Sequence, residues 1–231
     1  MKKAKMRNVY LLFSFILIIV VGALIILAAR HLNHGNLAHT RAVDDQSPVA
    51  VPFIITKDHI FYGTTTAPIQ VIIYSDLECP YCKHLYESTI LRIEASYKNS
   101  IVVAFRHDPL PSRPRALPEA YAAECVSMIG GESAFRSFID HVYRITPSDD
   151  RLDPALLPTL AAGTGIDVTR FNTCMKNGDS VQRVHSQIFQ ASIAGLNITP
   201  SIVLKSATRS YIVKGDYYGQ IAGAIDYLLK N

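Results

Sequence analysis

The pattern of hydrophobic and polar positions divides this chain into three parts. Residues 9–29 read VYLLFSFILIIVVGALIILAA and contain no charged residue. Residues 30–52 are largely polar and show little periodicity, which is typical of a linker. From residue 53 onward, short apolar runs alternate with helical patterns up to the last residue. We therefore expect a folded domain over residues 53–231.

The uncharged run is long enough to cross a membrane, because about 20 apolar residues at ~1.5 Å each span the hydrocarbon core. A cleaved signal peptide is the alternative, but its apolar region usually has about 7–15 residues and ends in spaced small residues. Here Leu27, rather than a small residue, lies two positions before Ala29. Four basic residues precede the run, so the positive-inside rule places residues 1–8 in the cytoplasm. We expect residues 9–29 to be a single-pass signal anchor in the cytoplasmic membrane, with the domain in the periplasm or outside the cell.

The first half of the domain pattern predicts two strands joined by a helix. Short β-type runs at residues 53–61 and a turn at residues 63–68 precede a nearly continuous apolar run, residues 69–74. A helical pattern from residue 82 to about residue 97 follows, and residues 101–105 form a second apolar run. Strand, helix and strand at this spacing predict a βαβ unit with two parallel strands.

The second half is mostly helical and ends in a hairpin and a last helix. Apolar spacings and capping residues predict helices at residues 117–128, 135–142, from 153, 167–178 and 180–194. Asp167 is expected to begin one of them, and Gly195 to end the last of this group. Short strands at residues 201–204 and 211–213 are close enough to pair, and the final helix follows Asp216.

The stretch Cys79-Pro80-Tyr81-Cys82 most clearly indicates chemistry. It lies at the start of a predicted helix, where unpaired N–H groups and the helix dipole favour a thiolate at Cys79. The thiolate is the nucleophile of disulfide exchange, and Cys82 is placed one turn further to attack a mixed disulfide. Half of a zinc site is the alternative, but it needs two more ligands and only His84 is near. The motif therefore predicts redox chemistry on protein thiols.

The charge balance argues against nucleic acid as a partner. Residues 1–30 carry five basic residues and no acidic one, whereas the remaining chain has 18 basic and 19 acidic residues. The net charge of +4 therefore comes from the N-terminal segment. No basic cluster interleaved with aromatic residues follows it, so we expect no nucleic-acid binding.

Three segments together resemble DsbA-like thiol:disulfide oxidoreductases, which are exported bacterial proteins of the thioredoxin superfamily. Residues 74–82, YSDLECPYC, resemble the active-site segment of that family, and residues 63–71, GTTTAPIQV, resemble the lead-in to its first core strand. Residues 198–201, ITPS, resemble its cis-proline loop. The resemblance covers residues 53–231. It implies an α/β, thioredoxin-like fold with a helical insertion at about residues 112–195.

The resemblance also implies roles for individual residues. Cys79 would be the exposed attacking thiol, and Cys82 the buried resolving thiol. The loop before the cis-proline would lie beside both sulfurs, and the backbone of Thr199 would pair with the main chain of the substrate. The substrate-binding residues implied in this way are Pro80, Tyr81, Thr199 and Pro200.

Three features differ from the strong oxidases of the family. The Pro-Tyr dipeptide and the threonine before the proline resemble glutaredoxins and the isomerase-like branch as much as those oxidases. In addition, the superfamily often has a buried acid six residues before the first cysteine, and here that position is Ile73. Asp76 and Glu78 are closer to the cysteines, and we expect them to be structural or solvated.

Cys125 and Cys174 lie on different predicted helices. Disulfides persist outside the cytoplasm, so the even number of cysteines is consistent with a second, structural disulfide. A bridge across roughly 50 residues would stabilise the domain by ~4 kcal/mol in the chain-entropy model. Two buried free thiols that pack as small hydrophobic groups are the alternative.

These observations together predict a membrane-anchored, monomeric oxidase of cysteine-containing exported proteins, recycled by a membrane or soluble redox partner. No metal, flavin or nucleotide is needed, because the cysteines carry the electrons. A shallow apolar groove would accept many clients. An isomerase or reductase is one alternative, although residues 30–52 are too few for the dimerisation domain of dimeric isomerases. A client-specific assembly factor of a secretion or conjugation apparatus is another, and it would keep its function after Cys79→Ala.

Overall fold

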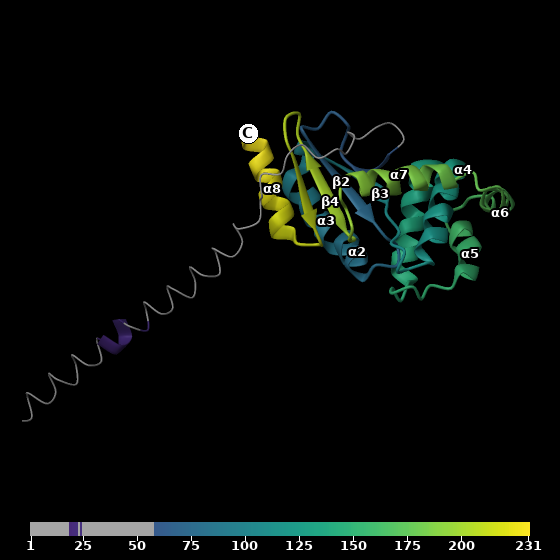
Figure 1. Cartoon of the computed structure of the whole chain (residues 1–231), viewed down its shortest axis with the longest axis horizontal. Helices are drawn as coiled ribbons and strands as arrows, with labels where there is room; N and C mark the ends of the chain where they lie inside the picture. The colour runs from purple at the N-terminus through teal and green to yellow at the C-terminus, as the bar shows by residue number, and fades with distance from the viewer. Residues whose placement is uncertain (1–18, 23, 25–57) are drawn as a thin grey trace, which may run out of the picture. The chain divides into compact units, whose positions relative to one another are not determined.

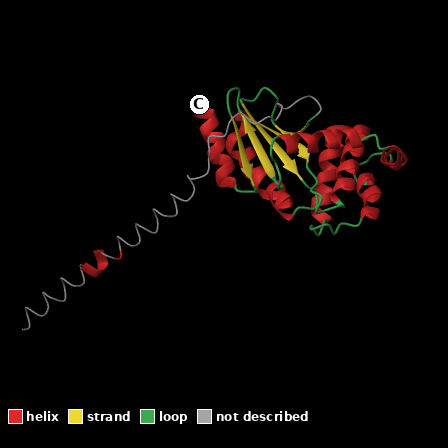
Figure 2. Ribbon diagram, viewed as in Figure 1, coloured by secondary structure: helices red, strands yellow, loops and turns green. Residues whose placement is uncertain are grey.

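Five strands form one mixed sheet in the order β1-β3-β2-β4-β5 (Figure 2). The strands are β1 (His59–Tyr62), β2 (Ile69–Ser75), β3 (Ile101–His107), β4 (Ser201–Lys205) and β5 (Ser210–Lys214). β2 and β3 are parallel, with Ile69 opposite Ile101 and Ser75 opposite His107, so the predicted βαβ unit is confirmed. The predicted hairpin of β4 and β5 is also confirmed, and β1 pairs antiparallel with β3 at the edge.

This computed structural model describes residues 19–22, 24 and 58–231. Residues 19–22 and 24 are helical, whereas the rest of the predicted anchor at 9–29 and the predicted linker at 30–52 lie outside the described residues. Within the described part of the chain, no helix is both long and apolar enough to span a bilayer.

The helix between β2 and β3 begins earlier than predicted and is interrupted. It consists of α2 (Pro80–His84), a π-helical turn (Leu85–Thr89) and α3 (Ile90–Tyr97). It begins at Pro80 because proline at the first helical position has a suitable φ and lacks only an N–H that would be unpaired there. The π-helical turn keeps the apolar face continuous, with Leu85, Ile90 and Ile93 buried, so periodicity alone did not indicate the interruption.

The predicted helical insertion lies between β3 and β4 (Figure 1). It contains α4 (Ala116–Ile145), α5 (Leu157–Ala162), α6 (Val168–Asn177) and α7 (Val181–Ile193). Gly131 has φ 74° and breaks α4 into two helical runs, which explains the two separate patterns in the sequence. Asp167 caps α6 by accepting the backbone N–H groups of Thr169 and Arg170, as its position predicted. The final helix, α8 (Tyr218–Lys230), follows β5.

Both faces of the sheet are buried, as the continuous apolar run of β2 predicted. Val71 and Ile73 belong to the core that includes α3 and α8, whereas Ile72 and Tyr74 belong to the core on the opposite face, with Ala191 of α7. Alternation along the strand sends successive side chains into the two layers. β2 therefore ends between two helical layers, and the short loop after Ser75 leads to the cysteine motif.

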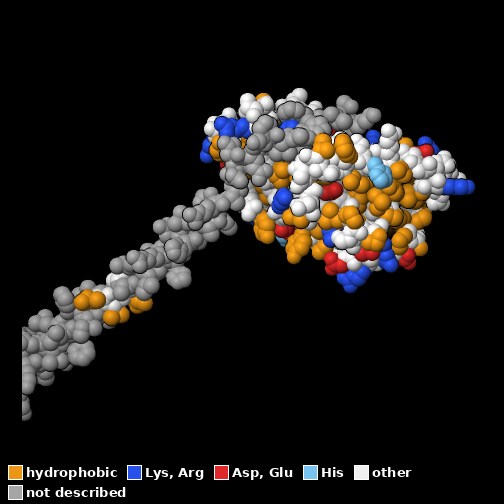
Figure 3. All heavy atoms as spheres, viewed as in Figure 1, with side chains coloured by type: hydrophobic (Ala, Val, Ile, Leu, Met, Phe, Trp, Pro, Cys, Tyr) orange, Lys and Arg blue, Asp and Glu red, His pale blue; other side chains and the backbone are white. Residues whose placement is uncertain are grey.

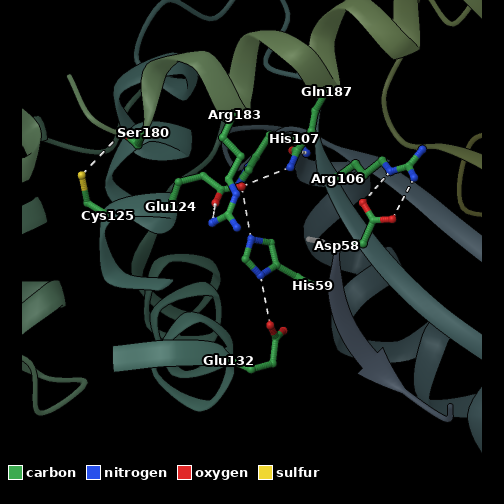
Figure 4. Close-up of polar contacts among 10 residues, drawn as sticks. All are labelled: Asp58, His59, Arg106, His107, Glu124, Cys125, Glu132, Ser180, Arg183 and Gln187. Carbon is green, nitrogen blue, oxygen red and sulfur yellow. Dashed lines mark hydrogen bonds and ion pairs between the residues drawn. The ribbon is translucent and has the colours of Figure 1, made fainter. Parts of the chain in front are cut away.

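A buried polar cluster joins the insertion to the edge of the sheet (Figure 4). The two ring nitrogens of His59 on β1 lie 3.1 Å from the carboxylates of Glu124 and Glu132 on α4. Arg183 on α7 donates to Glu124 at 2.9 Å. Burial acts to raise the pKa of Glu124, but His59, His107 and Arg183 together lower it to about 2. These charge-assisted contacts fix α4 and α7 on β1 and β3.

Candidate functional site

Cys79 is the N-cap residue of α2 and follows the loop that leaves β2. Its backbone is extended (φ −87°, ψ 121°), and its carbonyl oxygen accepts the N–H of Lys83 at 3.1 Å. The Cys79 sulfur lies 3.3 Å from the carbonyl oxygen of Thr199, a hydrogen-bond contact when the thiol is protonated. The fold thus brings together two motifs that are 120 residues apart in the sequence.

The prediction that Cys79 is exposed is wrong. Only 1 % of the residue is exposed, because the loop carrying Thr199 packs against its sulfur and Cys82 lies beneath it. The ring of Tyr81, in contrast, is 64 % exposed on the adjacent turn. The accessible surface beside the sulfur is therefore provided by the dipeptide between the cysteines, and the sulfur itself lies under the loop.

The two thiols have opposite pKa shifts. A hydrogen bond with the Cys82 thiol is the largest cause that lowers the pKa of Cys79 to about 6; Thr199 and the charge of Arg113 lower it further, while burial opposes them. Cys82 is fully buried, and burial followed by the hydrogen bond with Cys79 raises its pKa. At neutral pH, Cys79 is consequently the thiolate and Cys82 keeps its proton, which is the asymmetry that attack and resolution require.

The peptide bond between Thr199 and Pro200 is cis, as the resemblance implies. Pro200 lies directly before β4, and its carbonyl oxygen accepts the N–H of Gly215 at 2.8 Å. This bond attaches the loop to the chain beyond β5. Thr199 is itself buried, and it reaches Cys79 through its backbone.

Asp76 and Arg113 complete the site. Asp76 is buried rather than solvated, and its Oδ2 accepts the N–H of Leu110 at 2.9 Å and the Nε–H of Arg113 at 3.1 Å. Nη2 of Arg113 donates to the hydroxyl of Thr199 at 3.1 Å. Sequence analysis did not identify Arg113 as a site residue. The only signal for it was a pair of arginines in the proline-rich segment that follows a buried strand.

Glu78, directly before Cys79, is also buried, and its role is structural as expected. Its carboxylate accepts the backbone N–H groups of Arg151 at 3.1 Å and Leu152 at 2.7 Å. Glu119 lies next to it, and burial together with the charge of Glu78 raises the pKa of Glu119 to about 10. Glu78 thus holds the loop after α4 against the cysteine segment, whereas Ile73 is part of the apolar core.

A disulfide joins Cys125 of α4 to Cys174 of α6, with their Cα atoms 5.9 Å apart. It lies within the insertion, whereas Cys79 and Cys82 are free thiols at the start of α2. Over residues 58–231, no group of three or more His, Cys, Asp or Glu side chains is arranged to hold a metal ion. The two free cysteines among the described residues are Cys79 and Cys82.

Comparison with known proteins supports the fold that carries this site. A sequence model of the family described as thioredoxin matches residues 55–212. The crystal structure of Pseudomonas aeruginosa DsbA2 is 26% identical, with a TM-score of 0.65 over 77% of this chain and 98% of that chain. BdbD from Bacillus subtilis, in its oxidised form, is 19% identical, with a TM-score of 0.68 over 80% of this chain and 100% of that chain. The predicted thioredoxin-like fold with a helical insertion is therefore confirmed.

Two curated relatives are named as Na(+)/H(+) antiporters, and this chain matches only part of each. The Na(+)/H(+) antiporter NhaA 1 of Mycolicibacterium gilvum is 26% identical over 149 residues, which are 63% of this chain and 23% of the antiporter. The Na(+)/H(+) antiporter NhaA 3 of Salinispora tropica is 30% identical over 152 residues, 65% of this chain and 22% of that protein. The chain thus spans less than a quarter of the length of these relatives.

Proposed function

This chain belongs to the thioredoxin family and has a DsbA-like thiol:disulfide oxidoreductase fold, and from that premise we propose that it is an oxidase of exported protein thiols. The observation that carries the proposal is the asymmetry of its cysteine pair. Cys79 has a pKa of about 6 and touches the cis-proline loop, whereas Cys82 is buried and protonated. A thiolate that is stable at neutral pH is also a good leaving group.

The exchange requires no other redox group. A client thiolate attacks the Cys79 sulfur of the oxidised enzyme; the bond between the two enzyme sulfurs breaks, and Cys82 leaves and takes up a proton. A second client thiolate then attacks the client sulfur of the mixed disulfide, and Cys79 leaves as a thiolate. Two electrons pass from the client to the enzyme, and the two client thiols release two protons, of which Cys82 retains one.

The direction of electron flow follows from the stability of the reduced pair. Because the low pKa of Cys79 stabilises its thiolate, the reduced enzyme is favoured and the disulfide is oxidising. Threonine before the cis-proline and the Pro-Tyr dipeptide favour a milder oxidant than the strongest members. We therefore expect a reduction potential between ~−120 and ~−270 mV, the values of DsbA and thioredoxin.

The location and partners follow from the same proposal. Residues 9–29 would anchor the protein in the cytoplasmic membrane and residues 30–52 would connect the anchor to a domain in the periplasm or outside the cell. The clients would be exported proteins with cysteine pairs, which bind beside Tyr81, Thr199 and Pro200. A membrane or soluble redox partner would reoxidise Cys79 and Cys82.

The reduction potential of the Cys79–Cys82 pair against glutathione tests the proposal. The oxidised protein should also form a disulfide in a reduced two-cysteine peptide and be left as a dithiol, with one enzyme pair consumed per peptide. Cys79→Ser should lose this activity, while a Cys125→Ala/Cys174→Ala variant should keep it. A potential at or below ~−270 mV, with the peptide left reduced, would replace the oxidase by a reductase.

A further inference from the structure

An apolar groove lies beside the candidate site. Its volume is about 940 Å³, and it is bounded by the loop after β3, by α7 and by the loop before Thr199. Leu110, Leu117, Ile188 and Leu196 line it. Figure 3 shows hydrophobic side chains gathered on this face of the domain, over α7 and next to it.

The apolar surface continues beyond the groove. Phe189 and Ile193 on α7 are 64 % and 50 % exposed, and Ile198, directly before Thr199, is 43 % exposed. Adjacent exposed apolar side chains that lead from a groove to a reactive centre are typical of a binding surface for another protein. Arg113 connects the groove to the cysteine pair, because it lines the groove and donates to Thr199.

One acid in the groove lacks a hydrogen-bond donor. Asp108 is 5 % exposed and lines the groove, and its backbone N–H donates to the carbonyl oxygen of Ser75 at 2.8 Å. Among the described residues, none donates a hydrogen bond to its Oδ2. Two other polar residues of the groove already have partners: Arg113 binds Asp76, and His185 binds the hydroxyl of Tyr121 at 2.8 Å.

A buried carboxyl group without a hydrogen-bond donor raises the free energy of the folded protein, and a donor from a bound client would offset this increase. Burial and then the charge of Asp76 raise the pKa of Asp108 to about 7, so the group is readily ionised by a nearby cation. Lysine and arginine suit such a site because their stems are apolar and only their ends are charged. An acidic side chain would instead place a second negative charge beside Asp108.

We propose that this groove binds an extended apolar segment of the client that carries a lysine or arginine, and that the basic group pairs with Asp108. The inference rests on the proposed function, since the segment would flank the client cysteine that reacts with Cys79. Asp108 would thus be a specificity-determining residue, and the basic side chain would be recognised a few residues from the client cysteine.

Two-cysteine peptides that differ at one flanking position test this inference with the full chain. The position carries lysine, norleucine or glutamate, and it is moved in turn across the four residues on either side of the first cysteine. At the productive position, we expect kcat/KM for the lysine peptide to exceed that for norleucine by roughly tenfold, the effect of one hydrogen bond to a charged group. Asp108→Asn should bring this ratio close to one.

Two further variants keep the inference falsifiable if Asp108→Asn folds poorly. Asp179→Asn, at an exposed acid that does not line the groove, should keep the lysine preference. Ser192→Trp, at an exposed position in the groove, should lower kcat/KM for the lysine peptide, because the indole would fill part of the groove. Equal oxidation of all three peptides at every position would overturn the inference and leave the oxidase proposal intact. Oxidation of none of them would instead count against the oxidase proposal.

Discussion

A single guanidinium connects the two loops of the candidate site. Arg113 binds the carboxylate of Asp76 and the hydroxyl of Thr199, both at 3.1 Å, and its charge is one cause of the low pKa of Cys79. Arg113 belongs neither to the cysteine motif nor to the cis-proline loop. At the scale of single residues, a substitution of Arg113 can therefore change the pKa of Cys79 while both sulfurs stay in place.

Arg113→Met should raise the pKa of Cys79 above its value of about 6, because the variant lacks both the positive charge and the bond to Thr199. The rate of alkylation by iodoacetamide, followed against pH, measures this pKa. Arg115→Met is the matched control, since Arg115 donates to the carbonyl oxygen of Leu152 instead. An unchanged midpoint in the Arg113 variant would show that Cys82 and the helix terminus alone set the pKa.

A second residue-scale effect concerns stability. The pKa of Glu119 is about 10 in the folded protein, raised from the ordinary value of 4.5 by burial and by Glu78. Above pH 4.5 the unfolded chain loses this proton while the folded chain keeps it. The free energy of unfolding therefore falls as the pH rises toward 10, by up to ~1.4 kcal/mol per pH unit from this group.

Glu119→Gln removes this titration. Relative to the parent protein, the variant should therefore gain stability as the pH rises from 5 to 8, measured by urea unfolding at several pH values. Glu87→Gln, at an exposed position of the π-helical turn, is the control and should show no such trend. Parallel curves for the parent and the Glu119 variant would contradict the assignment.

At the scale of elements, the insertion is held together by its own covalent bond. The disulfide between Cys125 and Cys174 joins α4 to α6 across 49 residues of sequence, whereas α4 and α7 are attached to the sheet by the buried cluster around Glu124. The disulfide restrains the insertion internally. The polar cluster attaches the insertion to the sheet that leads to the cysteines.

The double variant Cys125→Ala/Cys174→Ala should lower the free energy of unfolding by ~4 kcal/mol, because the unfolded chain regains the entropy of a loop of roughly 50 residues. Chemical unfolding of the purified protein measures this loss. Mass spectrometry of a non-reduced digest should first recover the two cysteines in linked peptides. Recovery of both as alkylatable thiols without reductant would instead support two free, buried cysteines.

At the scale of the whole domain, four exposed apolar side chains lie on the elements that carry the cysteine pair, border the groove or precede the cis-proline. Tyr81, Phe189, Ile193 and Ile198 are all exposed, while Cys79 itself is covered. A client would therefore bind to a wide apolar surface, and the buried sulfur would react only after the cover of Thr199 moves aside. Such a surface suits unfolded chains, which expose apolar segments before their disulfides form.

The membrane anchor is tested on the full-length protein. If residues 9–29 form an uncleaved anchor, the protein should remain with membranes after carbonate washing and begin with the residues that precede the apolar run. Edman sequencing of the membrane-extracted protein checks the second point. A mature N-terminus near residue 30, in a soluble fraction, would show that the segment is a cleaved signal peptide.

The sequence by itself determined the local parts of this protein. Apolar periodicity predicted the parallel strands and the hairpin, and capping residues such as Asp167 and Gly178 marked the ends of α6. The spacing of Cys79 and Cys82 indicated the chemistry, and the resemblance of residues 198–201 indicated the cis-proline. These features are readable because each depends on a few neighbouring residues, whose backbone preferences act before any distant contact forms.

Only the tertiary structure decided the surroundings of the sulfurs. The burial of Cys79, the bonds of Arg113, the proton held by Glu119 and the unpaired oxygen of Asp108 all depend on segments that are distant in the chain. A one-dimensional pattern reports whether a residue is apolar, but not which charge lies beside it. Burial and neighbouring charge are what shift a pKa, and both exist only once the chain has folded.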